Sequence, residues 1–365
     1  MNQRLEKLQT WMKENDIEVS FLTSSENVFY LSGYYTNPHE RLLALVIFQE
    51  QEPFLVCPAM EVHDARRSGW EHEIIGFSDI ENPWEMVLNA INKRINAVAK
   101  VAIEKEHMNV ERYEHLSRLF PGAAYVSAEE KLRILRMVKD AKELKIIEEA
   151  CALADYAIEV GVSEIKEGRT ELEVLNAVEY ALKQKGVTEM SFSTMVLTGA
   201  NAASPHGNPG TTKIQKGDLV LFDLGVVVDR YCSDITRTVA FGDINDKQKE
   251  IYDTVLKAQL AAVEASKPGV SAAEVDLTAR RIIANAGYGE YFPHRLGHGL
   301  GISVHEYPSL TETNQLIIEE GMVYTIEPGI YVPNVAGVRI EDDLFIGADG
   351  AKVLTKFPKE LQIIK

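Results

Sequence analysis

The sequence has few cysteines, no long apolar run and no excess of positive charge. Its three cysteines, Cys57, Cys151 and Cys232, are scattered and odd in number, which excludes a disulfide framework and a zinc cluster built from thiolates. A membrane span needs roughly 18 consecutive apolar residues. The run LLALVIF is among the longest in this chain, so we expect no membrane-spanning segment and no membrane partner.

The charge balance is strongly acidic, with a formal net charge of −17. Binding to a phosphate backbone depends on clustered Lys and Arg, so nucleic acid is not an expected partner. The first 16 residues are charged and place Leu5, Leu8 and Met12 at helical spacing. They lack the apolar core of a secretion signal, and we therefore expect a cytoplasmic protein.

A chain of 365 residues with 45% hydrophobic residues is long enough for two domains. Over residues 1–127 short apolar runs alternate with helical patterns, which predicts an α/β domain. Residues 128–140 are dense in charge and have helical periodicity, so we interpret them as a helical linker. Residues 141–365 then form the second domain.

This second domain contains an internal repeat with an offset of 101 residues. The segments EGRTELEVLNAVEYALKQKG and PGVSAAEVDLTARRIIANAG align without gaps. Both open with a capping box, Thr170 to Glu173 and Ser271 to Glu274, and both end on a glycine suited to a helix C-terminus. We therefore expect two similar half-domains of mixed α and β structure, related by a pseudo-twofold axis.

Each repeat is followed by a predicted β-hairpin that carries one acid on each arm. These acids are Asp223, Asp234, Glu327 and Glu341. A turn centred between Val228 and Asp229 would place the two aspartates directly opposite one another, with Cβ atoms about 5 Å apart. A turn near Asn334 would do the same for the two glutamates. The sequence therefore predicts four carboxylates in one cleft.

Four carboxylates bring a charge of about −4 that a protein interior does not tolerate without cations. Arg237 and Arg339 lie on the same strands, and buried salt bridges to them are one interpretation. His298 favours a metal site instead, because glycines at 297, 299 and 301 let the backbone around this imidazole approach another group closely. Two Asp, two Glu and one His suffice for two divalent ions. Mainly oxygen ligands favour Mn(II) or Co(II), with Zn(II) and Fe(II) as alternatives.

The motifs around these residues resemble the proline-specific pita-bread metallopeptidases, the family of prolidase and aminopeptidase P. They are NVFYLSG in a creatinase-like N-terminal domain, followed by SPHGNPG, FDLG, SDITRT, HRLGHGLG, HE, TIEPG and VRIED. The similarity covers nearly the whole chain. It implies a creatinase-like α/β domain, a pita-bread catalytic domain of α+β class, a homodimer, and a small peptide substrate with proline at its second position.

The resemblance also implies roles for individual residues. The expected metal ligands are Asp223, Asp234, His298, Glu327 and Glu341. Among these, Asp234 and Glu341 would bridge two ions. Glu327 is similar to the family's proton shuttle, and Arg339 to the arginine that contacts the substrate or its carboxylate. His294 and His305 would donate hydrogen bonds to the substrate carbonyl, and His206 would line the pocket for proline.

The function implied is hydrolysis of the Xaa-Pro peptide bond. An Xaa-Pro dipeptidase is favoured because the chain is compact, and an Xaa-Pro aminopeptidase acting on longer peptides is the alternative. A non-catalytic peptide-binding module on the same scaffold would have lost ligands, whereas all five positions are occupied here. Methionine aminopeptidase has a similar core, but the extra N-terminal domain and VRIED favour the proline-specific branch.

Overall fold

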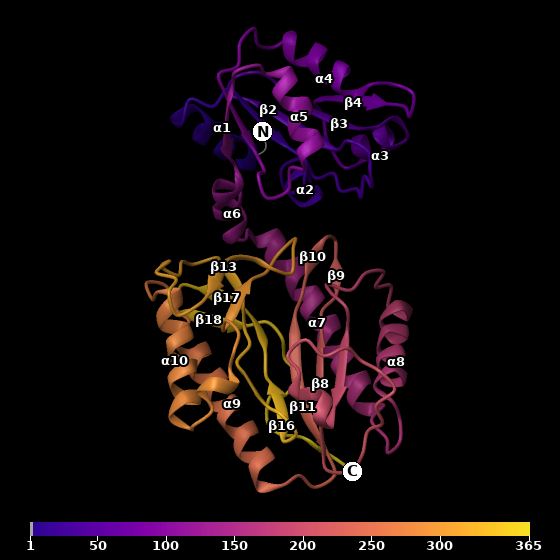
Figure 1. The fold of residues 1–365 in the computed structure, drawn as a ribbon, viewed down its shortest axis with the longest axis vertical. Coiled ribbons are helices and arrows are strands. Elements are labelled where there is room, and N and C mark those ends of the chain that lie inside the picture. Colours follow the sequence, from indigo (N-terminus) through magenta and orange to yellow (C-terminus); the bar gives the residue numbers. More distant parts are fainter. Residues whose placement is uncertain (1–2) are drawn as a thin grey trace. The chain divides into compact units, whose positions relative to one another are not determined.

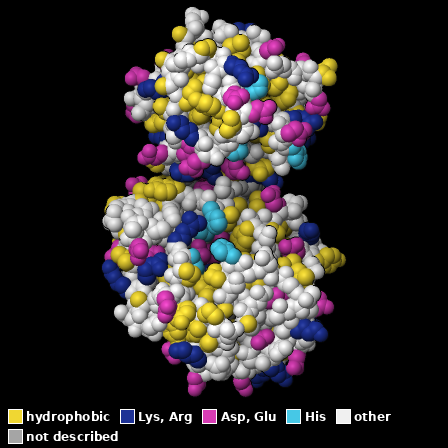
Figure 2. Space-filling model, in the orientation of Figure 1, with side chains coloured by type: hydrophobic (Ala, Val, Ile, Leu, Met, Phe, Trp, Pro, Cys, Tyr) yellow, Lys and Arg dark blue, Asp and Glu magenta, His cyan; other side chains and the backbone are white. Residues whose placement is uncertain are grey.

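The structure is a computed structural model that describes residues 3–365. The chain divides into two compact units, with the boundary between Arg136 and Met137 (Figure 1). The predicted linker over 128–140 contains the helix α6 (Glu129–Met137). On the face seen in Figure 2, lysine and arginine side chains are scattered among acidic ones. Within residues 3–365, none of the helices carries an apolar stretch long enough to cross a membrane.

The first unit is built on a six-stranded mixed sheet with the order β4-β3-β2-β1-β5-β6. Its strands are β1 (Val19–Leu22), β2 (Ala44–Phe48), β3 (Phe54–Pro58), β4 (Glu73–Phe77), β5 (Lys100–Ile103) and β6 (Ala124–Ser127). Its other helices are α1 (Gln3–Glu14), α2 (Ser25–Ser32), α3 (Val62–Arg67), α4 (Pro83–Asn92), α5 (Val110–Leu119) and the 3-10 turn η1 (Ala59–Glu61). Strands β1 to β3 are buried along their whole length, as expected from their mainly apolar sequences. The predicted α/β character of this part of the chain is confirmed.

Helix α1 follows the spacing seen in the sequence. Leu5, Leu8 and Met12 are all buried, which puts one stripe of the helix against the core of the first unit. The helix was predicted within residues 1–16, and residues 1 and 2 of that range lie outside the described residues.

The second unit contains two pairs of helices and two main sheets (Figure 1), whose strands pair antiparallel except that β19 runs parallel to β11. The helices are α7 (Ala141–Ser163), α8 (Glu171–Gln184), α9 (Asp246–Ala265) and α10 (Ala272–Asn285), with 3-10 turns η2 (Gly199–Ala203) and η3 (Gly289–Tyr291). The first sheet has the order β19-β11-β8-β7, from β7 (Met195–Thr198), β8 (Asp218–Leu224), β11 (Ile235–Phe241) and β19 (Ile363–Ile364). The second has the order β13-β12-β14-β17-β18, from β12 (Gly297–Gly299), β13 (Glu306–Leu310), β14 (Val323–Ile326), β17 (Asp342–Gly347) and β18 (Gly350–Val353). Two short ribbons pair β9 (Val227–Val228) with β10 (Tyr231–Cys232), and β15 (Gly329–Val332) with β16 (Ala336–Arg339).

The two halves of this unit repeat each other in local detail. Thr170 and Glu173 form the complete predicted capping box of α8. At α10 the Ser271 side chain accepts the hydrogen bond from the Glu274 backbone N–H, but the Glu274 carboxylate binds Arg281 at 2.9 Å, so the predicted box is incomplete. After both helices the glycine has a positive φ, +90° at Gly186 and +87° at Gly287. The predicted internal repeat is therefore present in the fold.

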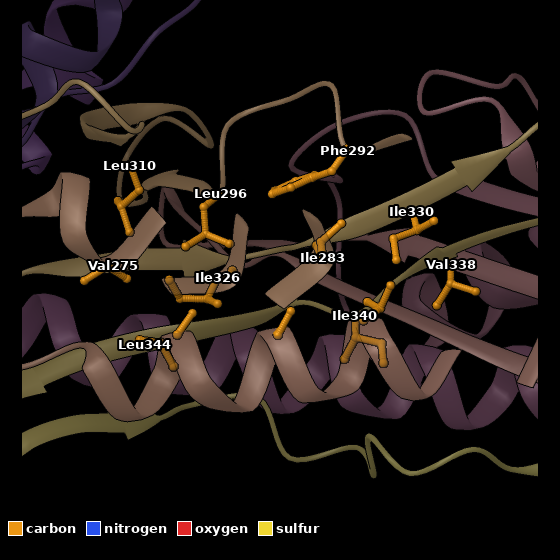
Figure 3. Packing of buried hydrophobic residues seen from close by; sticks show 14 of the residues in the cluster. Val275, Ile283, Phe292, Leu296, Leu310, Ile326, Ile330, Val338, Ile340 and Leu344 are labelled. Carbon is orange, nitrogen blue, oxygen red and sulfur yellow. The ribbon is translucent and has the colours of Figure 1, made fainter. Parts of the chain in front are cut away.

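Helices α9 and α10 cover a core that fixes the second hairpin. Val275 and Ile283 of α10 belong to one buried cluster with Ile326 of β14, Leu344 of β17 and Ile340, which lies between β16 and β17 (Figure 3). Burying one such side chain stabilises the fold by about 1.5–3 kcal/mol. Apolar packing on one face of the strands therefore fixes the backbone of the second hairpin, which also carries the acids Glu327 and Glu341.

The first hairpin differs from the prediction in its register. Asp229 and Arg230 both have positive φ, 44° and 72°, and form a two-residue turn one position later than predicted. Asp223 therefore faces Thr236, and the prediction that it directly faces Asp234 is wrong. A shift of two residues keeps the same face of the sheet, so both aspartates still point to the same side.

The second hairpin has the predicted register. Ile326 pairs with Asp342 before the acids, and Gly329 pairs with Arg339 after them. Both pairs follow the same strand register. In this register Glu327 lies opposite Glu341, between the ladder of β14 with β17 and the ladder of β15 with β16. The turn contains Asn334 at φ 60°. The prediction that the two glutamates face each other is confirmed.

Candidate metal centre

Three of the predicted ligands form one compact buried group. Ligand atoms of Asp234, His298 and Glu341 all lie within 4.8 Å of one another. Asp234 lies between β10 and β11, His298 is the central residue of β12, and Glu341 lies between β16 and β17. The group thus joins both halves of the second unit.

The other two predicted ligands lie beside this group. Glu327 Oε1 is 3.3 Å from His298 Nε2, and Asp234 Oδ2 is 3.7 Å from the same nitrogen. The negative charge of Asp223 raises the pKa of Asp234, Glu327 and Glu341, so it acts on the same small volume. The structure therefore brings all five residues together.

Several carboxylate oxygens in this group are buried without a hydrogen-bond donor among the described residues. They are Asp223 Oδ1, Asp234 Oδ1 and Glu341 Oε1. A buried carboxylate oxygen without a partner is costly, and protons or cations are the partners that remain. The donor set therefore fits divalent ions, because such ions prefer carboxylate oxygens with a neutral imidazole.

The electrostatics of the acids lead to the same conclusion. Burial raises the pKa of Asp234 well above its ordinary value, and the charges of Glu341 and Asp223 raise it further. Burial likewise raises the pKa of Glu341, helped by Glu327 and Asp223. Burial raises the pKa of Glu327 to about 7. Divalent cations beside these groups would reverse the shifts and keep the carboxylates ionised.

His298 is held in the form that ligates metals. Burial lowers its pKa to about 3, so the imidazole is neutral. Nδ1 lies 3.1 Å from the Gly299 carbonyl oxygen and donates to it, which leaves the Nε2 lone pair toward the carboxylates. The neighbouring glycines are required by close backbone contacts, since a Cβ at Gly297 would lie 1.9 Å from the Thr325 carbonyl oxygen.

Two acids that directly follow Glu341 hold neighbouring groups of the centre in place. Neither was predicted from the sequence. The Asp343 carboxylate accepts a 2.9 Å hydrogen bond from the backbone N–H of Asp234. Asp342 pairs at 2.7 Å with Arg237, whose guanidinium also donates to the backbone carbonyl of Glu341. The positive charge of Arg237 therefore neutralises Asp342. It does not offset the negative charge of the four predicted acids.

Arg339 is bound within the protein. Its guanidinium donates to the Asp223 carboxylate, to Tyr331 Oη at 2.6 Å and to Thr236 Oγ1 at 3.1 Å. Thr236 Oγ1 in turn donates to Glu341 Oε2 at 2.6 Å. The predicted contact between Arg339 and substrate would have to compete with these partners, and Tyr331 was not anticipated from the sequence.

The three other predicted histidines lie near the ligand group. His294 Nε2 is 3.0 Å from Tyr331 Oη, and burial lowers the pKa of His294 to about 4. The His305 ring stands edge-on to the His298 ring with centroids 4.4 Å apart. His206 is exposed, and its charge acts on both His294 and His305. Figure 2 shows histidine side chains gathered on the face of the second unit turned to the viewer.

The raised pKa values predict how pH affects the stability of the metal-free protein. Burial raises the pKa of Glu327 to about 7 and that of Asp343 to about 8. From pH 6.5 to 8 the folded state therefore holds protons that the unfolded chain has lost, so the free energy of unfolding falls as pH rises. The buried histidines have lowered pKa values, so over this window they bind protons only in the unfolded chain and only at its lower end, where they oppose the trend. The fall in stability is therefore clearest above about pH 7.5.

Thermal unfolding measured in EDTA and in excess Mn(II) tests this prediction. We expect the Tm to decline across the window in EDTA and to decline less with Mn(II), because bound cations keep the ligand carboxylates ionised. Parallel slopes under both conditions would contradict the assignment of these carboxylates to a cation site.

Comparisons with known proteins agree with this geometry. Residues 145–348 match metallopeptidase family M24, and residues 4–138 match the creatinase/prolidase N-terminal domain. An Xaa-Pro dipeptidase of Lactobacillus helveticus is 45% identical over 362 residues, covering 99% of this chain and 98% of that protein. The solved prolidase of Pyrococcus horikoshii OT3 is 39% identical with a TM-score of 0.92, covering 99% of this chain and 100% of that one. A solved Xaa-Pro dipeptidase from Bacillus anthracis is 34% identical with a TM-score of 0.93, covering 99% of both chains.

These matches confirm the predicted fold class, with a creatinase-like N-terminal domain and a pita-bread catalytic domain. The family implies divalent metal ions, and the buried Asp, His and Glu group is suited to hold them. The match to metallopeptidase family M24 covers more than half of the chain, so the protein belongs to this family.

Proposed function

We propose that this protein is an Xaa-Pro dipeptidase that uses two divalent ions, Mn(II) or Co(II), to hydrolyse the bond before proline. The observation that carries the proposal is the buried group of acids with His298, in which one carboxylate oxygen each of Asp223, Asp234 and Glu341 has no hydrogen-bond partner among the described residues. The similarity to proteins named Xaa-Pro dipeptidase and prolidase supports the choice of substrate. We also propose a homodimer and a cytoplasmic location, both of which the sequence analysis anticipates.

The five predicted ligands divide between the two halves of the unit. Asp234 and Glu341 would bridge the ions, as the resemblance to the family implies, and both are buried in one group with His298. Asp223 would complete one set of ligands, and His298 with Glu327 the other. When bound, the ions supply Lewis acidity and lower the pKa of water.

Glu327 is the residue that we expect to move the proton. Its Oε1 lies at the edge of the ligand group, 3.3 Å from His298 Nε2. A carboxylate there can take a proton from the attacking water and pass it to the nitrogen of the leaving proline.

The three histidines near the ligand group have separate proposed roles. His294 and His305 would donate hydrogen bonds to the substrate carbonyl and to the negative charge that develops on it. His294 is orientated by its contact with Tyr331. His206 is exposed nearby and would contact the proline side of the substrate.

A comparison of substrates tests the proposed function. The purified full chain, supplied with Mn(II) or Co(II), is offered Ala-Pro, Ala-Pro-Ala and Ala-Ala. We expect rapid cleavage of Ala-Pro alone. Cleavage of Ala-Pro-Ala at a similar rate would instead favour an Xaa-Pro aminopeptidase, and cleavage of none of the three would contradict peptidase activity on Xaa-Pro bonds.

A further inference from the structure

Glu171 carries a buried carboxylate that has no part in the proposed mechanism. It is the first residue of α8, and its side chain is fully buried. One carboxylate oxygen accepts hydrogen bonds from the Thr198 backbone N–H at 2.8 Å and from Asn201 Nδ2 at 3.0 Å. The other accepts from the Gly210 backbone N–H at 2.8 Å and from Asn201 Nδ2 at 3.0 Å. Both oxygens of the carboxylate are therefore satisfied by neutral donors of one segment.

The donors to Glu171 border a single loop. Thr198 is the last residue of β7, and Gly210 ends the stretch SPHGNPG, which carries His206. We call residues 199–209 the His206 loop. Because one oxygen of Glu171 binds the residue before this loop and the other binds the residue after it, a single side chain holds the two ends of the loop together.

The His206 loop packs against the ribbon that joins two predicted metal ligands. Its 3-10 turn η2 contacts both β15 and β16. The contact with β16 is close, since a Cβ on Gly337 would collide with the Ala202 carbonyl oxygen. The β15-β16 ribbon connects Glu327 to Glu341 along the chain. The position that Glu171 fixes is therefore directly beside the candidate metal centre.

The chain that follows the loop has a second attachment to the start of α8. The Glu171 backbone N–H donates to the Thr212 carbonyl at 3.1 Å, and the Ile214 backbone N–H donates to the Arg169 carbonyl at 2.9 Å. These backbone contacts do not depend on the Glu171 side chain. A change confined to the carboxylate should therefore loosen the His206 loop and leave the rest of the fold in place.

We propose that Glu171 is a positioning residue for substrate binding, which holds the His206 loop where its imidazole contacts the proline side of the substrate. This role rests on the proposed function, because it acts through the contact assigned there to His206. A carboxylate accepts hydrogen bonds on both oxygens at once, so one side chain can fix both ends of the loop. A loop ordered in advance spares substrate binding the entropy cost of ordering it.

Glu171→Gln tests the role, because it replaces one acceptor oxygen with an NH2 group of nearly the same size. That group would face an N–H donor of the segment, so a hydrogen bond is lost at one end of the loop. With Mn(II) and Ala-Pro we expect KM to rise about 10-fold, the effect of roughly one buried hydrogen bond, and kcat to stay within a factor of about 3. Metal content should match the wild type.

Glu173→Gln is the matched control. Glu173 is exposed in the same turn of α8, and glutamine also serves at this position of a capping box. The control should keep the wild-type KM and kcat. A Glu171→Gln protein that also keeps the wild-type KM would overturn the role of Glu171.

A double-mutant cycle with His206→Ala shows whether Glu171 acts through the loop. His206→Ala should itself raise KM, and Glu171→Gln should then raise it further by less than a factor of about 2. A purely structural role would lower the Tm or the folded fraction and leave the KM of the folded enzyme unchanged. Effects on KM that multiply in the double variant would contradict the proposal.

Amide hydrogen exchange tests the contact without substrate. The N–H groups of Thr198 and Gly210 should exchange at least about 10-fold faster in Glu171→Gln, while the middle of α8 keeps its protection. Equal exchange in both proteins would refute the contact. If Glu171→Gln does not fold, Asn201→Leu takes its place, since it removes the side-chain donor to both oxygens. A wild type that cleaves no Ala-Pro contradicts the proposed function, whereas an unchanged KM in an active enzyme contradicts the role of Glu171 alone.

Discussion

Asp234→Asn is expected to abolish metal binding and peptide hydrolysis together, and to make the metal-free protein more stable near neutral pH. The Asp234 carboxylate is buried beside Glu341 and Asp223, and burial with their charges raises its pKa. Asparagine has nearly the same shape and resembles the protonated carboxyl, so the repulsion disappears from the metal-free state. The same change removes a bridging ligand. The loss of activity should exceed the roughly 10²- to 10³-fold cost of removing a single transition-state donor.

Metal content after dialysis, thermal unfolding in EDTA, and turnover of Ala-Pro together test this prediction. Asp253→Asn is a matched control, because Asp253 is exposed on α9 and pairs with Lys249 at 2.7 Å. The control should bind metal and cleave Ala-Pro as the wild type does. An Asp234→Asn protein that keeps its metal and full turnover would show that this carboxylate is not a bridging ligand.

Glu327→Gln is expected to lower kcat by about 10²- to 10⁴-fold, the usual contribution of a positioned acid or base, with a much smaller change in KM. The amide keeps the size of the side chain and can still offer an oxygen, but it cannot accept a proton and release it again.

Steady-state kinetics on Ala-Pro across neutral pH measure this effect, with metal content determined on the same samples. The control is Glu320→Gln, which changes an exposed glutamate in the loop before β14. A Glu327→Gln protein with unchanged kcat would refute the shuttle. One that has lost its metal would show that Glu327 acts chiefly as a ligand.

Much of the site could be predicted from spacing, because a β-strand alternates its faces every residue. The register of the second hairpin followed from a turn near Asn334, a residue that adopts positive φ readily. The first hairpin turns at Asp229 and Arg230, and arginine at φ 72° gives no such signal. The register error was two residues, which preserved the face and hence the prediction that both aspartates enter one cleft.

The partners behind the ligands could not be predicted in the same way. Arg339 reaches Asp223, and Asp343 reaches the backbone of Asp234, across more than one hundred residues of sequence. Such contacts depend on how the two halves dock, which local periodicity does not encode. Tyr331 was missed for the same reason, since its hydroxyl becomes significant only when it lies between His294 and Arg339.

Diffraction from crystals grown with excess Mn(II), recorded for anomalous scattering at the manganese edge, tests the central claim most directly. We expect two anomalous peaks per chain, both bound by oxygens of Asp223, Asp234, Glu327 and Glu341, with His298 Nε2 on one of them. Crystals that contain saturating Mn(II) but show no peak at these oxygens would contradict the account.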